Sequence, residues 1–226
     1  MEIAAVVLAR SVAFVETIDL NPRGLLSLPH TVALINERFQ FKTSPLNKPP
    51  LKDGEKENKD LEFKDGYFQG VGVGKLTISG DGVVVDVRSS TTDAKRIIND
   101  SLTWLGKEIG LYYSPEMITR WSYVSQLTFY SKVDILKPNA ALSRLKERLT
   151  ASVLAEHEEA YDFESTAVAL DFDRTLHKRG TIQFTIQRRQ DARFSENKYY
   201  SDAPVSTEEH IELLQAYEAD MKELNK

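Results

Sequence analysis

Two carboxylates two residues apart, Asp171 and Asp173, are the side chains whose type and spacing are best suited to chemistry. They follow the apolar run from Val168 to Leu170. Residues i and i+2 of a strand project to the same side, so both carboxylates would meet one substrate or one cation. Alternatively, Asp171 and Asp173 are the solvent-facing positions of a half-buried strand, with Thr166 to Phe172 facing the core.

The segment from Val168 to Leu176 resembles the first motif of the haloacid dehalogenase phosphatases, in which a strand ends in Asp-x-Asp-x-Thr. That resemblance implies a magnesium-dependent phosphatase in which Asp171 is the nucleophile, Asp173 the acid/base and Thr175 a phosphate contact. The family also needs a parallel sheet downstream that supplies a hydroxyl, a lysine and further carboxylates. Here an alternating strand follows instead, and Arg174 replaces the usual glycine, so the phosphatase is the least favoured alternative.

Other patterns that suggest chemistry lack the surroundings that the chemistry requires. The glycines of Gly70–Lys75 lie inside an apparent strand and not before a helix. We therefore interpret them as permitting a bulge, a sharp coil of the sheet or a close approach by another backbone, rather than binding phosphate. The 4 histidines are not spaced as metal ligands, and with no cysteine there is no thiolate site. We therefore expect no metal, no cofactor and, on balance, no enzyme.

A second group of candidate residues is suited to binding, because it combines large rings with guanidinium groups. Its members are Trp121, Tyr123, Phe129, Arg188 and Arg189. Rings beside arginines are typical of proteins that bind single-stranded nucleic acid. The net charge of −5 argues against that function, since counterion release needs a basic surface. The aromatic residues would instead line a small-molecule cavity or a protein contact.

The elements that position these residues are predicted from hydrophobic period and turn chemistry. Residues 71–78 and 83–87 read as a hairpin around Ser79–Gly82, followed by a helix that ends at Gly110. Residues 166–224 repeat this hairpin-then-helix order, with a capping box at Ser206 opening the last helix.

The remaining segments complete the prediction. Long strands are expected over Ile3–Leu20 and Ile118–Val133. Pro29 opens a helix whose buried stripe is Val32, Ile35 and Phe39. Pro138 opens another helix, and its predicted buried stripe consists of Leu142, Leu145, Leu149 and Val153.

The sequence thus predicts a single α+β domain over 1–226, with a mainly antiparallel twisted sheet, helices on one face and a flexible loop at about 44–60. Two pseudo-symmetric hairpin-helix halves are an open possibility. The function we expect is a non-catalytic interaction or assembly domain that self-associates through the sheet or its edges, with itself or another protein as partner. A ligand cavity between sheet and helices is the alternative, and nucleic acid is not favoured. We expect no membrane segment and a cytoplasmic location, which the absence of cysteine fits.

Overall fold

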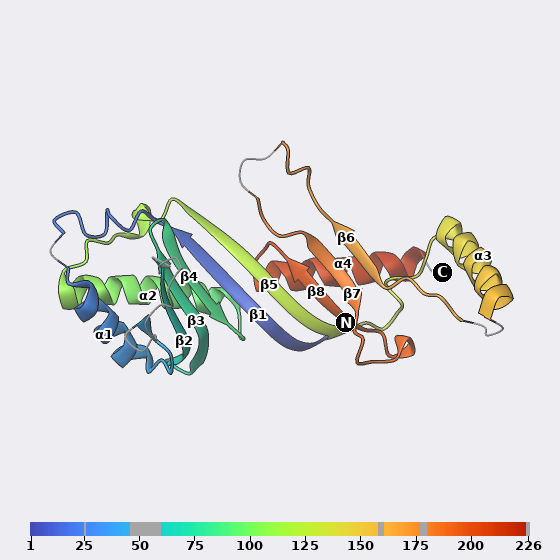
Figure 1. The fold of residues 1–226 in the computed structure, drawn as a ribbon, viewed down its shortest axis with the longest axis horizontal. Helices are drawn as coiled ribbons and strands as arrows, with labels where there is room; N and C mark the ends of the chain where they lie inside the picture. Colours follow the sequence, from blue (N-terminus) through green and yellow to red (C-terminus); the bar gives the residue numbers. More distant parts are fainter. Residues whose placement is uncertain (25, 46–59, 158–160, 177–179, 225–226) are drawn as a thin grey trace. The chain divides into compact units, whose positions relative to one another are not determined.

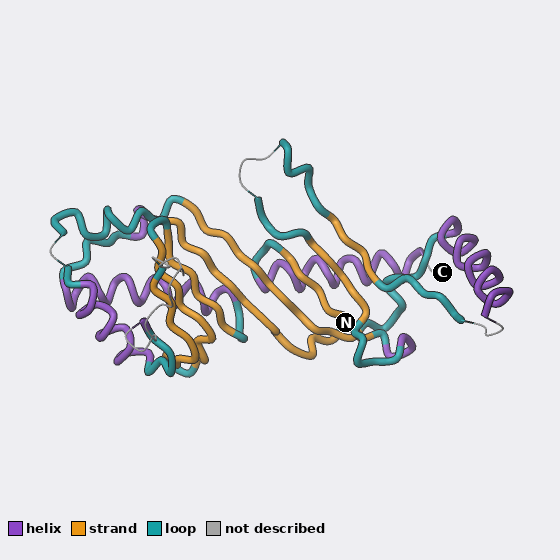
Figure 2. The backbone as a smooth tube through the Cα atoms, in the orientation of Figure 1, coloured by secondary structure: helices purple, strands orange, loops and turns teal. Residues whose placement is uncertain are grey.

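The computed structural model describes residues 1–24, 26–45, 60–157, 161–176 and 180–224. Within these ranges the chain forms eight β-strands and four α-helices, which Figure 1 labels and Figure 2 colours by type. The first half of the chain forms β1 (Glu2–Phe14), α1 (Leu28–Phe39), β2 (Leu61–Phe68), β3 (Val71–Ser79), β4 (Gly82–Val87) and α2 (Thr91–Ile109). The second half forms β5 (Arg120–Tyr130), α3 (Ala140–His157), β6 (Ala167–Leu170), β7 (Phe184–Arg188), β8 (Lys198–Ala203) and α4 (Thr207–Leu224).

One open sheet joins the strands in the order β2-β3-β4-β1-β5-β8-β7-β6. The pairings with a described register, for example β1 with β4 and β6 with β7, are antiparallel. The predicted α+β class with a mainly antiparallel sheet is therefore confirmed. The element order β-α-β-β-β-α occurs twice along the chain, and the strand order reads the same from both edges of the sheet. Each predicted hairpin-helix half is thus part of a longer repeated order of elements.

The described chain divides into two compact units. Unit 1 comprises Met1–Ala5, Leu127–Asp202 and Glu212–Lys226, and unit 2 comprises Val6–Gln126 and Ala203–Ile211. Whether they form the single domain predicted from the sequence stays a prediction. Most of the loop predicted at about 44–60 lies outside the described residues.

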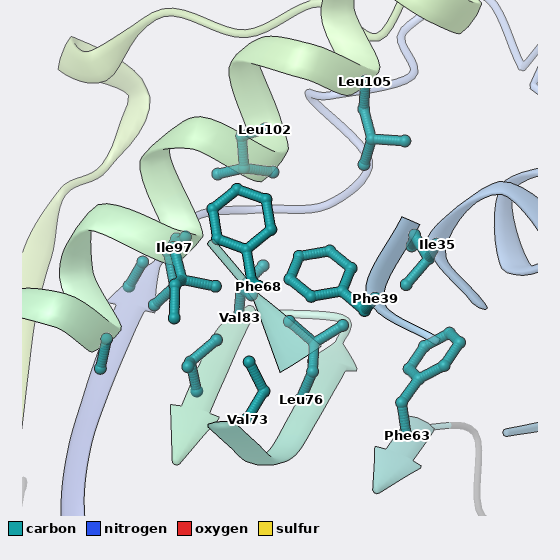
Figure 3. Packing of buried hydrophobic residues seen from close by; sticks show 14 of the residues in the cluster. Ile35, Phe39, Phe63, Phe68, Val73, Leu76, Val83, Ile97, Leu102 and Leu105 are labelled. Atoms are coloured by element: carbon teal, nitrogen blue, oxygen red, sulfur yellow. The ribbon is translucent and has the colours of Figure 1, made fainter. Parts of the chain in front are cut away.

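Unit 2 is built on the β3–β4 hairpin, and the sequence explains its core. The predicted stripe of α1 is confirmed, because Val32, Ile35 and Phe39 are all buried. Figure 3 shows α1 and α2 covering the same side of the strands, with Phe39 and Phe68 packed ring against ring at a centroid distance of 5.0 Å. Stacked aromatic residues of this kind bury much apolar area and hold a helix firmly on a sheet.

The ends of α2 follow from its sequence. The Ser90 hydroxyl accepts a hydrogen bond from the Asp93 N–H, which satisfies a free donor of the first turn. At the other end Gly110 takes φ 76°, a left-handed conformation that glycine adopts without a steric penalty. The β3–β4 register shifts between Val73 and Lys75, at Gly74, which agrees with the bulge, one of the three roles expected for these glycines.

The first strand is shorter than predicted. β1 ends at Phe14, and the expectation of a strand up to Leu20 is wrong because backbone turns begin there, with the Asp19 N–H bonded to the Glu16 carbonyl. The buried side of β1 carries small residues, among them Ser11, whose hydroxyl donates to the Thr91 carbonyl at 2.8 Å. Small side chains on this strand let the start of α2 approach closely.

Unit 1 has its own buried centre, in which β8 is an element that the sequence reading missed. Leu127, Phe129, Ile186 and Tyr199 are buried together with Leu214 of α4. The predicted start of α4 at Ser206 is confirmed, because the Glu209 N–H donates to the Ser206 hydroxyl, which is one of the two hydrogen bonds of the predicted capping box. Further along α4, the Glu218 carboxylate accepts hydrogen bonds from the Ser131 hydroxyl and the Lys132 N–H.

Candidate functional site

Asp171 and Asp173 lie in a loop that follows β6, and both are exposed. Asp171 accepts from its neighbour's N–H, that of Phe172, and this hydrogen bond lowers its pKa. Asp173 accepts from the hydroxyl and the N–H of Thr175, which lower its pKa in the same way. These contacts form a local turn. Both carboxylates are therefore ionised and hydrogen-bonded within their own loop.

The surroundings that the phosphatase motif requires differ from those of β6. This strand is at the edge of the sheet and pairs antiparallel with β7, whereas the motif belongs at the end of a parallel strand. Leu170, which the half-buried strand interpretation placed in the core, is 63% exposed, so that expectation is wrong. In the part of the chain that the structure describes, no group of three or more His, Asp or Glu side chains is arranged to hold a metal.

The two arginines proposed as binding residues are held by carboxylates of their own unit. Arg188 is buried and lies 2.7 Å from Asp134, and it also donates to the Ser165 and Phe194 carbonyls. Arg189 forms hydrogen bonds of 2.9 and 3.2 Å to the two carboxylate oxygens of Asp191. Their donors are therefore used in structural contacts, and a role in binding nucleic acid stays a prediction.

The three aromatic candidates of β5 do not come together around one opening. Phe129 is fully buried and packs against Tyr199, with ring centroids 5.6 Å apart. Trp121 is half-buried with the Lys95 ammonium 5.0 Å from its ring centroid, and Tyr123 is half-buried as well. Trp121 and Tyr123 belong to unit 2 and Phe129 to unit 1. Their predicted role as binding residues stays a prediction.

A cavity between sheet and helices exists in unit 2, but other residues line it. It has a volume of about 440 Å³ and lies among α1, α2, the β3–β4 hairpin and the loop that follows β1. Leu102 and Leu105 of α2, which Figure 3 shows pointing toward the core, form one of its walls. The signal missed in the sequence is long-range, since the lining residues run from Thr17 to Leu111.

A buried serine-histidine pair was also missed by the sequence reading. The Ser125 hydroxyl lies 3.0 Å from Nδ1 of His210, and both residues are fully buried. Burial lowers the pKa of His210 to about 4, so the imidazole is neutral near pH 7. A substrate has no access to a pair that is 0% exposed. The pair therefore serves packing between β5 and the first turn of α4.

Helix α3 presents the largest departure from the predicted burial. Its leucine stripe was expected to be buried, and this is wrong: Leu142, Leu145 and Leu149 are 48%, 59% and 41% exposed. Val153, the fourth residue of the predicted stripe, is half-buried. Leu154 is 46% exposed, and none of the described side chains of α3 is buried. An amphipathic helix normally owes its stability to burying such a face, and no element within the described part of the chain covers this one.

The two borders of this stripe carry different charge. On one border Lys146 pairs with Asp162 at 2.8 Å and with Glu164 at 2.7 Å, which gives this group a net negative charge. On the other border, next to Leu145, lies Arg148, which has no carboxylate partner among the described residues. Figure 1 shows α3 standing apart from strands β6, β7 and β8 of the same unit. The stripe is thus an apolar surface with one acidic and one basic edge.

Comparison of the chain with known proteins does not assign it to a family. No protein-family model matches the chain, and neither a curated protein nor a solved structure matches it significantly. In the described part of the chain, no helix combines the length and apolar character needed to cross a bilayer.

Proposed function

We propose that this protein is a non-catalytic assembly module that self-associates through the leucine stripe of α3. The observation that carries the proposal is the exposure of Leu142, Leu145 and Leu149 on a helix of 18 residues. Their spacing of three and four residues is that of a coiled-coil seam, in which each leucine packs between side chains of a facing helix. A second copy of the chain offers a matching surface, which makes a two-fold pair the simplest occupant.

The charged borders favour a parallel pair of α3 helices. In a parallel pair, opposite borders of the two stripes meet, so the border that carries Arg148 in one copy runs beside the border that carries Lys146, Asp162 and Glu164 in the other. Asp162 keeps 82% of its side chain exposed and is available for such a contact. Arg148, which has no carboxylate partner among the described residues of its own copy, would therefore lie near the acidic border of the second copy.

The edges of the sheet are less suited to association than the helix. β6 is four residues long, and short edge strands resist pairing with another chain. The other edge strand, β2, carries the ion-paired side chains Glu62 and Lys64 and is bridged by Thr43. Charged side chains and local cover are the usual protection of such edges. Association through α3 is therefore proposed in place of the expected contact through the sheet or its edges.

The test is the molar mass in solution, measured by light scattering over a range of protein concentrations. Replacing Leu145 by Glu removes about 1 kcal/mol of burial per copy, or about 2 kcal/mol per dimer, which weakens association by about 30-fold. Leu213→Glu is the matched control, because Leu213 is also a helical leucine and is 47% exposed. A monomer at all concentrations, or equal weakening by both variants, would reject the proposal.

A further inference from the structure

The cavity of unit 2 has walls of hydrocarbon. Leu102 and Leu105 of α2 form one side, Leu28 of α1 forms another, and Ile78 and Val83 of the hairpin form the floor. These residues come from the same unit, so the cavity belongs to one packed body. Its volume of about 440 Å³ falls within the usual range of small-molecule sites, roughly 300–1,000 Å³.

The polar side chains that reach the cavity are already engaged with their own chain. Thr17 donates to the Gly80 carbonyl at 2.9 Å, and Thr31 donates to the Ser27 carbonyl at 3.1 Å. Ser79 donates to Asp81 at 2.8 Å, and the Asn21 carbonyl oxygen accepts from the Leu26 N–H at 3.4 Å. None of the described lining residues is charged. An ionised ligand group placed here would lose its hydration without gaining a partner, which is strongly unfavourable.

We propose that this cavity binds a small, uncharged, apolar molecule. A dry apolar cavity of about 150 Å³ holds one benzene, so a cavity about three times larger suits roughly 15–18 non-hydrogen atoms. Water is a poor competitor, because a well-held water needs two to four polar partners, and the hydroxyl groups of Thr17, Thr31 and Ser79 already donate to other groups of the chain. An alkyl chain that ends in an uncharged group such as a hydroxyl has the required chemistry, and so does a fused hydrocarbon ring system.

The proposal is tested with N-phenyl-1-naphthylamine, an uncharged dye whose fluorescence rises in apolar surroundings. We expect saturable binding by the purified chain and displacement by dodecanol. Dodecanoate has a similar chain and carries a charge, so it should compete at least about tenfold less well. Absence of saturable binding, or equal competition by the acid and the alcohol, would overturn the proposal.

Two variants locate the bound dye. A Cβ at Gly80, which lines the cavity, meets no atom within 4 Å, so Gly80→Leu adds volume without a clash at that atom. It should weaken dye binding at least about tenfold. Gly72→Leu is the matched control: its Cβ is equally free, and Gly72 does not line this cavity, so its affinity should stay within about twofold of the original. Equal loss in both variants would place the dye elsewhere and refute the site.

A second substitution covers the case in which Gly80→Leu does not fold. Thr31→Asp puts a carboxylate into the same lining and should weaken dye binding, whereas Thr31→Leu should preserve it. Leu145→Glu in α3 should leave dye binding unchanged, since Leu145 belongs to unit 1. If Leu145→Glu abolished the signal, the dye would be bound at the leucine stripe and the cavity proposal would be wrong.

Discussion

The buried imidazole of His210 makes the stability of the fold dependent on pH. Its pKa is lowered from 6.5 to about 4, and burial is the cause. As the pH falls below 6.5, the unfolded chain binds a proton on this ring while the folded protein does not. The contribution of His210 to stability is therefore complete above pH 6.5 and is lost progressively as the pH falls toward 4.

The size of this effect follows from the shift. Each pKa unit corresponds to about 1.4 kcal/mol, so a shift from 6.5 to about 4 amounts to roughly 3 kcal/mol of unfolding free energy. A loss of that size is a large fraction of the stability of an ordinary domain. Urea unfolding at a series of pH values between 7 and 4 should show the loss, with the slope concentrated in this window.

His210→Asn isolates the contribution, because the amide can still hydrogen-bond to Ser125 and takes up no proton. In this variant the loss of unfolding free energy between pH 6.5 and 4 should be smaller than in the unmodified protein by roughly 3 kcal/mol. His30→Asn is the control, since His30 is exposed, and it should keep the original slope. Identical pH slopes in the His210 variant and the unmodified protein would refute the reasoning, as would an NMR titration of the His210 ring near pH 6.5.

Three further predictions concern packing, a buried ion pair and the aspartate loop. Gly82→Ala should destabilise unit 2 by about 1–3 kcal/mol in urea unfolding, because a Cβ there would lie 2.5 Å from the Ala13 carbonyl oxygen. Gly72→Ala is the control: a Cβ at Gly72 meets nothing within 4 Å, so this variant should change stability by less than about 0.5 kcal/mol. Arg188→Met should lower the unfolding free energy by roughly 3 kcal/mol, since it removes the cation paired with Asp134 and the donor to the Ser165 and Phe194 carbonyls. An unchanged midpoint would contradict the structural role of Arg188. Neither the unmodified chain nor Asp171→Asn should show magnesium-dependent phosphatase activity above background. An activity in the unmodified chain that Asp171→Asn abolished would support the phosphatase interpretation of this motif.

The parts of the fold that were predicted correctly depend on local chemistry. Ser90, Gly110 and Ser206 mark helix ends through hydrogen bonds or dihedral angles within a few residues, so their types carry the information. The β3–β4 hairpin is similarly local. The stripe of α1 was predicted because Val32, Ile35 and Phe39 follow the helical period and a sheet is there to cover them.

The parts that were missed depend on partners far away in the sequence. β8 looked too polar to be a buried strand, yet Tyr199 is buried because Asp134 and Arg188 supply partners for its hydroxyl. The strand β2 was missed as well, and it contains Asp65 at φ 54°, which interrupts the simple alternation. The hydrophobic periodicity of one sequence does not predict which distant residues will pair with a side chain.

The candidate surfaces show the same limit. Periodicity identified the apolar stripe of α3 correctly, but it carries no information on whether anything in the same chain covers that stripe. The residues that line the cavity of unit 2 come from segments between Thr17 and Leu111, and no short motif joins them. The phosphatase-like motif at Asp171 and Asp173, by contrast, is a short motif, and it forms a locally hydrogen-bonded turn.

The pairing of two α3 helices is tested most directly by a disulfide, because the chain has no cysteine of its own. In a parallel pair, residue 149 of one copy faces residue 149 of the other across the seam, within reach of an S–S bond. Under mild oxidation Leu149→Cys should give a covalent dimer, whereas Leu213→Cys on α4 should stay monomeric. A Leu149→Cys protein that stays monomeric, or a Leu213→Cys protein that cross-links equally fast, would contradict self-association through the leucine stripe.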